Sequence, residues 1–301
     1  MDSGASPEGA CPILARMRRL VLVCLLAGGP ALADAVAATT RLEVHAPADS
    51  PARWLLLVRG RRLVRYEVFL NALPLVSGTG DDAQVAVPID PSWLRAGENA
   101  LEVKVTTPGK GARTDGPALE VSLHALPAGA VDGSGERDLE PMPRLTHWRL
   151  TARPMPHQIA AFVLPDRGWP IGQLWRTAEV MPSLTEADRA ALRALQRRRV
   201  EAFRTGDRPA LESLEKFRLD VAAQAGPAVR DEAKKMLDLI TAPEQKEQLQ
   251  GLVLAEPATF ELVGEGRVAI VSNPVADAAV PMRTWAARIA GTWVVVPDSP
   301  R

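Results

Sequence analysis

Apolar residues fall at every second position in several short segments between residues 40 and 125, a period that fits β-strands. Leu101, Val103 and Val105 alternate with Glu102 and Lys104, which predicts one buried and one exposed strand face. The other segments, alternating or continuously apolar, are 42–44, 54–58, 66–70, 85–89 and 119–123. Glycine, proline, aspartate and asparagine separate them, as is typical of antiparallel sandwiches. We therefore predict an N-terminal antiparallel β-sandwich over residues 40–125.

The apolar period changes after residue 182. Ser183 and Glu186 form a capping-box pattern, so we expect a helix from there to about Arg204. Two further helices are expected after 206–207 and after 226–227. The last of these carries an apolar stripe at helical spacing: Val229, Ala233, Met236, Leu237 and Ile240.

The end of the chain returns to strand patterns. Segments 259–263 and 267–271 flank 264–266, and segments 282–289 and 292–296 flank 290–291, which predicts two hairpins. Helices followed by an antiparallel sheet indicate an α+β domain over 183–301. The fold class is therefore mixed, and the chain of 301 residues is long enough for two domains.

Two segments without a clear period lie between the predicted domains. Residues 126–145 are rich in glycine, proline, serine and charge, which predicts a linker. Residues 146–182 contain Trp148, Trp169 and Trp175 among several prolines, and we expect an extended, irregular interdomain strap there. These tryptophans either dock the strap on both domains or form a surface for a partner or ligand.

The N-terminus carries an export signal pattern. A positive start at 17–19, a short apolar run at 20–29 and small residues at 31–33 predict a secretory signal peptide cleaved after Ala33. Met17 is the expected start, with residues 1–16 upstream. The alternatives are an uncleaved anchor and a lipoprotein modified at Cys24. Cleavage predicts a periplasmic or secreted protein without a transmembrane anchor.

Charge and cysteine content narrow the function classes. Lys+Arg and Asp+Glu are both 36, so there is no basic excess, and we predict no nucleic-acid partner. Arg197, Arg198 and Arg199 are interpreted as a solvated helix face. Cys11 and Cys24 both precede the predicted cleavage site, so the mature chain would hold no disulfide and no cysteine metal ligand.

Two regions resemble known families. Segments 66–71 (YEVFLN) and 93–103 (WLRAGENALEV) resemble galactose-binding-like β-sandwich modules, with Ala72 standing where that family usually has glycine. Segments 202–211 (AFRTGDRPAL), 266–271 (GRVAIV) and 291–296 (GTWVVV) resemble an NTF2-like domain. The second resemblance implies helices packed on a curved antiparallel sheet, a fold that hosts enzymes, binding proteins and assembly modules.

No catalytic set emerges from these patterns. An NTF2-like isomerase would need a carboxylate base and an oxyanion donor, but Tyr66 is the only tyrosine, and Glu261 alternates with apolar neighbours as an exposed strand residue would. His147 and His157 lie near the tryptophans without a third metal ligand at suitable spacing, so we expect no metal and no cofactor.

The residues that remain as candidates for binding share one region of the chain: His147, Trp148, His157, Trp169 and Trp175. We therefore predict an exported, non-enzymatic binding or protein-interaction protein with a periplasmic protein partner or a small ligand. The alternative is an exported enzyme that acts on a carbohydrate or other small molecule through carboxylates.

Overall fold

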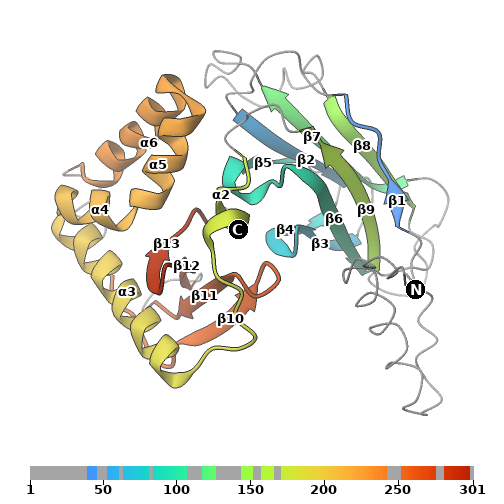
Figure 1. The fold of residues 1–301 in the computed structure, drawn as a ribbon. Helices are drawn as coiled ribbons and strands as arrows, with labels where there is room; N and C mark the ends of the chain where they lie inside the picture. Colours follow the sequence, from blue (N-terminus) through green and yellow to red (C-terminus); the bar gives the residue numbers. More distant parts are fainter. Residues whose placement is uncertain are drawn as a thin grey trace, which may run out of the picture. The chain divides into compact units, whose positions relative to one another are not determined.

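The computed structural model describes ten stretches of the chain: 39–45, 53–60, 64–80, 84–106, 117–126, 144–151, 157–165, 171–242, 252–275 and 281–298. The predicted signal peptide, both cysteines, Trp169 and most of the predicted linker lie outside these residues. Ala37–Arg301 form one compact unit. The fold is mixed, with mainly antiparallel sheets and a few helices (Figure 1).

Among the described residues between 39 and 165, nine strands form two sheets, and we call this part of the chain the β region. One sheet has the order β1-β9-β6-β3-β4 and the other β5-β2-β7-β8. The strands are β1 (Thr40–Arg41), β2 (Arg53–Gly60), β3 (Val64–Leu70), β4 (Leu73–Gly80), β5 (Gln84–Ile89), β6 (Gly97–Thr106), β7 (Pro117–Leu126), β8 (Arg144–Thr151) and β9 (His157–Leu164). Neighbouring strands are antiparallel except β1 and β9, which pair in parallel.

The two sheets of the β region contribute to one apolar core. Val58 of β2 lies opposite Val121 of β7, and Val68 of β3 lies opposite Val103 of β6. All four valines are at most 1% exposed and belong to the same core cluster. The alternation in the sequence thus matches the alternation of buried and outer side chains, and the arrangement is compatible with a β-sandwich.

The β region reaches further along the chain than the sequence indicated. Strand β8 begins in the last residues of the predicted linker (126–145) and continues into the segment expected to be an irregular strap (146–182), and β9 lies inside that segment. The two strands extend the two sheets by pairing with β7 and β6. On β8, Trp148 and Leu150 are buried while Arg149 between them is exposed, which is the period of a strand. These two segments form strands because they pair with β7 and β6, a long-range contact that their local composition does not indicate.

Strand β4 was also missed, because it carries Pro74 and Gly78. It lies at the edge of its sheet, where a missing N–H does not interrupt a ladder. Gly78 faces the Tyr66 ring, and a Cβ there would stand 2.7 Å from Tyr66 Oη. Pro74 is therefore tolerated on this edge strand, and Gly78 leaves room for the Tyr66 ring.

Five helices follow between residues 171 and 242: α2 (Gln173–Thr177), α3 (Glu186–Thr205), α4 (Arg208–Leu214), α5 (Lys216–Ala225) and α6 (Pro227–Ile240). The capping box at the start of α3 uses Thr185 and Asp188, not the predicted Ser183 and Glu186. This start leaves Leu184 outside the helix, where it packs on the cluster that contains Leu192.

Four antiparallel strands complete the fold in sequence order: β10 (Thr259–Val263), β11 (Val268–Asn273), β12 (Met282–Ile289) and β13 (Thr292–Val295). Both expected hairpins are present. Side chains on the two faces of β11 belong to different cores, because Ala269 and Val271 pack with α3 whereas Val268 and Ile270 join the core of the β region. Strand β11 is therefore buried on both faces.

Two helix-surface expectations need correction. Arg197 and Arg198 are exposed, but Arg199 is buried, and its Nε donates to Glu215 Oε1 at 2.9 Å. Met236 of the predicted apolar stripe is 49% exposed, whereas Leu237 beside it is buried. Helix α6 packs against α5 and α4, so its buried face is narrower than the stripe suggested.

Candidate functional site

The predicted tryptophans have different roles in the structure. Trp148 is 6% exposed and lies in the core of the β region. Trp175, on α2, is partly buried, and its Nε1 donates to the Trp93 carbonyl at 2.8 Å. Neither ring forms an open binding surface in the described part of the chain, and Trp169 is outside it.

Trp175 lies where the β region meets the C-terminal strands, a place we call the junction. The Arg95 guanidinium stacks 4.0 Å from the centre of the Trp175 ring and pairs with Glu265 at 2.8 Å. The Gly264 N–H donates to the Ala72 carbonyl at 3.0 Å. Trp175 therefore contacts residues of both regions, as a residue that straps them together would.

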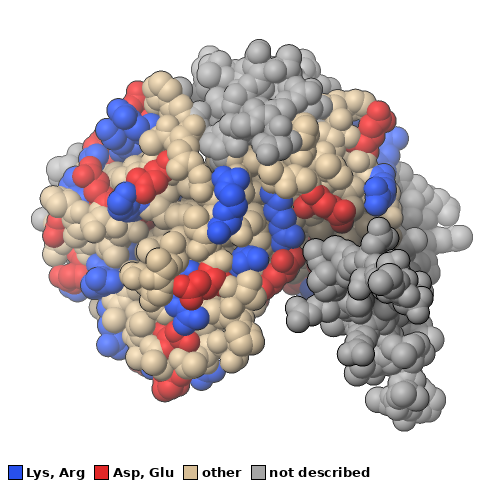
Figure 2. Space-filling model, viewed as in Figure 1, with Lys and Arg blue, Asp and Glu red and all other residues tan. Residues whose placement is uncertain are grey.

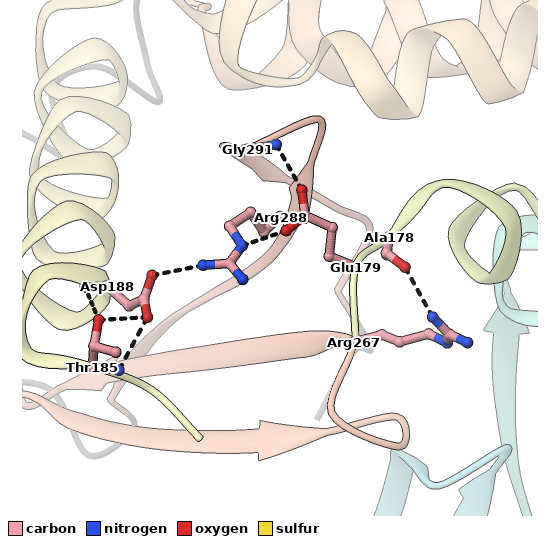
Figure 3. Close-up of polar contacts among 7 residues, drawn as sticks. All are labelled: Ala178, Glu179, Thr185, Asp188, Arg267, Arg288 and Gly291. Atoms are coloured by element: carbon pink, nitrogen blue, oxygen red, sulfur yellow. Dashed lines mark hydrogen bonds and ion pairs between the residues drawn. The ribbon is translucent and has the colours of Figure 1, made fainter. Parts of the chain in front are cut away.

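A set of hydrogen bonds continues from the junction to α3, and we call it the junction network: Glu179, Thr185, Asp188, Arg288 and Gly291 (Figure 3). Arg288 Nε donates to Glu179 Oε2 at 2.7 Å, and its Nη1 donates to Asp188 Oδ1 at 3.2 Å. The Gly291 N–H donates to Glu179 at 2.6 Å, and Thr185 Oγ1 donates to Asp188 at 2.7 Å.

These hydrogen bonds favour the ionised carboxylates. The bonds from Thr185 hold the pKa of Asp188 below its ordinary value. The Gly291 N–H, followed by Arg288, does the same for the pKa of Glu179. Each charge in the junction network has a partner, so the network has a structural role.

A second polar cluster lies on the outer face of the sheet β5-β2-β7-β8, around a hollow of about 30 Å³ that we call the polar hollow. The residues that line it come from β2, β7 and β8: Leu57, Arg59, Glu120, Ser122, His124, Arg144 and His147. A volume of this size holds one or two water-sized groups. The hollow can thus admit the head group of a ligand but not a whole sugar ring.

Strand register brings these side chains together. Ser122 of β7 lies opposite His147 of β8, and Glu120 lies opposite Arg149. On the other side of β7, Arg59 of β2 lies opposite Glu120. Cross-strand neighbours are about 5 Å apart, so alternate residues of three strands form one polar surface.

The alternating polar residues of β7 are buried, although alternation alone would place them in water. Glu120, Ser122 and His124 are 8%, 7% and 2% exposed. Buried polar groups are normally retained only with hydrogen-bond partners. Their burial is the feature that marks this face as more than a solvated surface.

Some polar groups of the hollow have clear partners. Ser122 Oγ lies 2.9 Å from His124 Nε2, and Arg149 Nε lies 3.3 Å from Glu120 Oε1. Two nitrogens of Arg59 donate to Gln84 Oε1 at 2.7 and 3.1 Å.

His147 differs from them, because neither of its ring nitrogens has a hydrogen-bond partner among the described residues, and both atoms are buried. Burial, followed by the charge of Arg144, lowers the pKa of His147, so its ring is neutral near pH 7. A neutral imidazole carries one donor and one acceptor. His147 therefore presents unused hydrogen-bonding capacity to the hollow.

The other predicted histidine is elsewhere. His157, at the start of β9, is exposed, and its Nε2 lies 2.7 Å from Glu102 Oε1 on the other sheet of the β region. Of the four candidate residues that the structure describes, only His147 lies in the polar hollow, and Trp169 is outside the described residues. Ser122 and His124 of the hollow were not among the predicted residues, although they alternate with Val121 and Leu123 along β7 in the sequence.

The charges around the hollow favour an anion over a cation. Among the described residues that line the hollow, Arg59 and Arg144 are positively charged and Glu120 carries a carboxylate, which pairs with Arg149 at 3.3 Å. Among the described residues, no group of three His, Cys, Asp or Glu side chains is placed to hold a metal ion. The face drawn in Figure 2 shows the two charge signs interspersed over the helices, without one dominant patch.

Comparisons with known proteins assign no family, because no protein-family model, curated protein or solved structure matches the chain. No helix in the described stretches combines the length and apolar character that a membrane crossing requires.

Proposed function

We propose that this chain is an exported, periplasmic or secreted, binding or protein-interaction protein without enzymatic activity, and that the polar hollow is its binding site. The observation that carries the proposal is that the two ring nitrogens of the half-buried His147 are buried and have no partner among the described residues. A buried polar group without a partner costs about 1–3 kcal/mol. A ligand that hydrogen-bonds to His147 would offset that cost.

The proposal includes the finer fold assignment. A β-sandwich is supported by the two sheets that share one core, and an NTF2-like domain by helices followed by an antiparallel meander. Because β9 ends at Leu164, we propose that the sandwich extends at least to that residue instead of ending at 125.

The alternative, an exported enzyme that uses carboxylates on a carbohydrate, has less support. Glycoside hydrolysis needs two carboxyl groups on either side of the reacting bond. Among the residues that line the hollow, Glu120 alone carries a carboxylate, and Arg149 holds it in an ion pair. Glu120 is therefore better suited to fix charge than to transfer a proton.

Native mass spectrometry tests the binding proposal. The full chain is expressed in an exporting bacterial host, purified from the periplasm and compared with His147→Gln and with the matched variant His157→Gln. We expect a retained ligand or partner that is lost in His147→Gln and kept in His157→Gln. A retained species that survives both substitutions would place the binding site elsewhere.

The same sample tests the export proposal. The intact mass should correspond to a chain that begins at Asp34 and lacks both cysteines, so that a thiol reagent adds no mass. Lipid on Cys24, or a chain that remains in the cytoplasm, would contradict the proposed compartment without affecting the proposed site.

A further inference from the structure

We propose that the polar hollow binds the oxoanion of a small molecule, a carboxylate or phosphate group, with Arg144 as its charge partner and His147 as a hydrogen-bond donor. This inference rests on the proposed function, because it names the ligand class of the same site.

The charge balance supports an anion. Arg149 pairs with Glu120 at 3.3 Å, and Arg144, which also lines the hollow, adds a positive charge there. Arg144 makes no ion pair with a described residue and is exposed, so its guanidinium can turn toward a ligand. Arginine forms paired, charge-assisted hydrogen bonds with carboxylates and phosphates. A cation would instead meet the positive charge of Arg144.

The size of the hollow and its hydrogen-bond donors suit the oxoanion head group of a ligand. Its volume of about 30 Å³ suits a few atoms rather than a ring. Ser122 and His124 form one wall at 2.9 Å from each other, and His147 lies opposite Ser122 in the strand register. An oxoanion in the hollow could accept hydrogen bonds from His147 and Ser122 while the rest of the molecule stays in solvent.

Binding should be linked to protonation of His147. The groups that face it are Arg59 on β2, Glu120 and His124 on β7, and Arg144 and Arg149 on β8. Without a ligand, burial and Arg144 keep the ring neutral. A bound anion adds a negative charge beside the ring and gives its second N–H an acceptor, so both effects favour the protonated form. Affinity should therefore rise as the pH falls.

Calorimetric titration of the full-length protein tests the inference. The probes are acetate, inorganic phosphate, glucose and ammonium, each at pH 6 and pH 8 and at constant ionic strength. We expect acetate or phosphate to bind with a Kd of about 1 mM, a realistic limit for so few atoms. Affinity should be several-fold higher at pH 6. Binding of one anion and not the other would identify the head group.

Two variants and a matched control locate the effect. Arg144→Gln should weaken anion binding about tenfold, which corresponds to about 1.4 kcal/mol for a charge-assisted hydrogen bond. His147→Gln should remove the pH dependence, whereas Arg198→Gln, on the exposed face of α3, should change neither. The pH comparison in the unaltered protein remains decisive if a variant does not fold.

Binding of glucose or ammonium but of neither anion, with loss in His147→Gln, would overturn the oxoanion inference and leave the proposed site intact. If anions bind but neither Arg144→Gln nor His147→Gln changes the binding, both the oxoanion inference and the proposed site are wrong. If no probe binds, the oxoanion inference fails, and the mass-spectrometric comparison decides the proposed function separately.

Discussion

The junction network and the polar hollow are both clusters of charged and polar residues on or beside a sheet, but they differ in how their groups are satisfied. In the junction network, Arg288 bridges two carboxylates, and a backbone N–H completes one of them. In the polar hollow, the two ring nitrogens of His147 are buried without a partner among the described residues.

This difference distinguishes a cluster that stabilises the fold from a cluster that can bind a ligand. A satisfied network stabilises one arrangement of the chain, and a ligand would gain little by entering it. An unsatisfied buried group lowers the stability of the free protein, and a ligand that hydrogen-bonds to the group recovers that stability. The two clusters should therefore respond differently to substitution, to acid and to added anions.

Substitution of Trp175 should have the largest effect. Trp175→Ala removes a ring that packs at the junction, stacks with Arg95 and donates to Trp93. We expect a loss of about 3 kcal/mol in the free energy of unfolding, measured by denaturant titration. His147→Ala should cost far less.

The matched control for Trp175→Ala is Arg198→Ala on the exposed face of α3. A near-normal melting temperature for Trp175→Ala, together with weaker recovery of a partner, would show that Trp175 belongs to a binding surface and not to a strap.

Acid should weaken the junction network at low pH. The pKa of Asp188 in the folded protein lies below its ordinary value of 3.8, so its contribution is fully present above that value and is lost as the pH falls below it. Thermal melts between pH 7 and pH 2.5 should show this loss, and Asp188→Asn should reduce it. If Asp188→Asn loses as much stability in acid as the unaltered protein does, ionised Asp188 does not contribute to the stability of the network.

The polar hollow should respond to acid at a higher pH. The pKa of His147 is lowered from 6.5 by burial, so the unfolded chain takes up a proton first, and stability falls as the pH drops below 6.5. His147→Gln should flatten this part of the curve, and saturating acetate should offset it. Equal curves with and without His147 would show that the ring is not buried as described.

The smallest effect concerns the turn beside the junction. Ala72 adopts a left-handed conformation with φ 61°, which a glycine accepts more readily than an alanine. Ala72→Gly should raise the free energy of unfolding by about 0.5 kcal/mol, after allowance for the greater freedom of glycine in the unfolded chain. Ala96→Gly, at an exposed residue without this conformation, should give no gain.

Features set by neighbouring residues were predictable from the sequence. The β10–β11 and β12–β13 hairpins follow their turn residues, and Gly264 and Gly266 do take positive φ angles. The segment 93–103, which carries the resemblance to galactose-binding-like modules, contains the start of β6 at Gly97. The structure adds that Asn71 Nδ2 donates to Asn99 Oδ1 at 2.9 Å inside the β region.

Features set by distant partners were not predictable. Arg199 looked exposed because its partner Glu215 is sixteen residues away, beyond the reach of a single helix face. His147 and Ser122 form one site only because β8 pairs with β7 in a particular register. The alternation on β7 indicated which residues share a face, but it could not indicate that this face is buried.

Nitrogen NMR of the His147 imidazole tests the central claim most directly, because it observes the group on which the binding site depends. We predict that His147 titrates below 6.5 in the free protein and at a higher pH in saturating acetate. A His147 pKa at its ordinary value that acetate does not move would contradict the account.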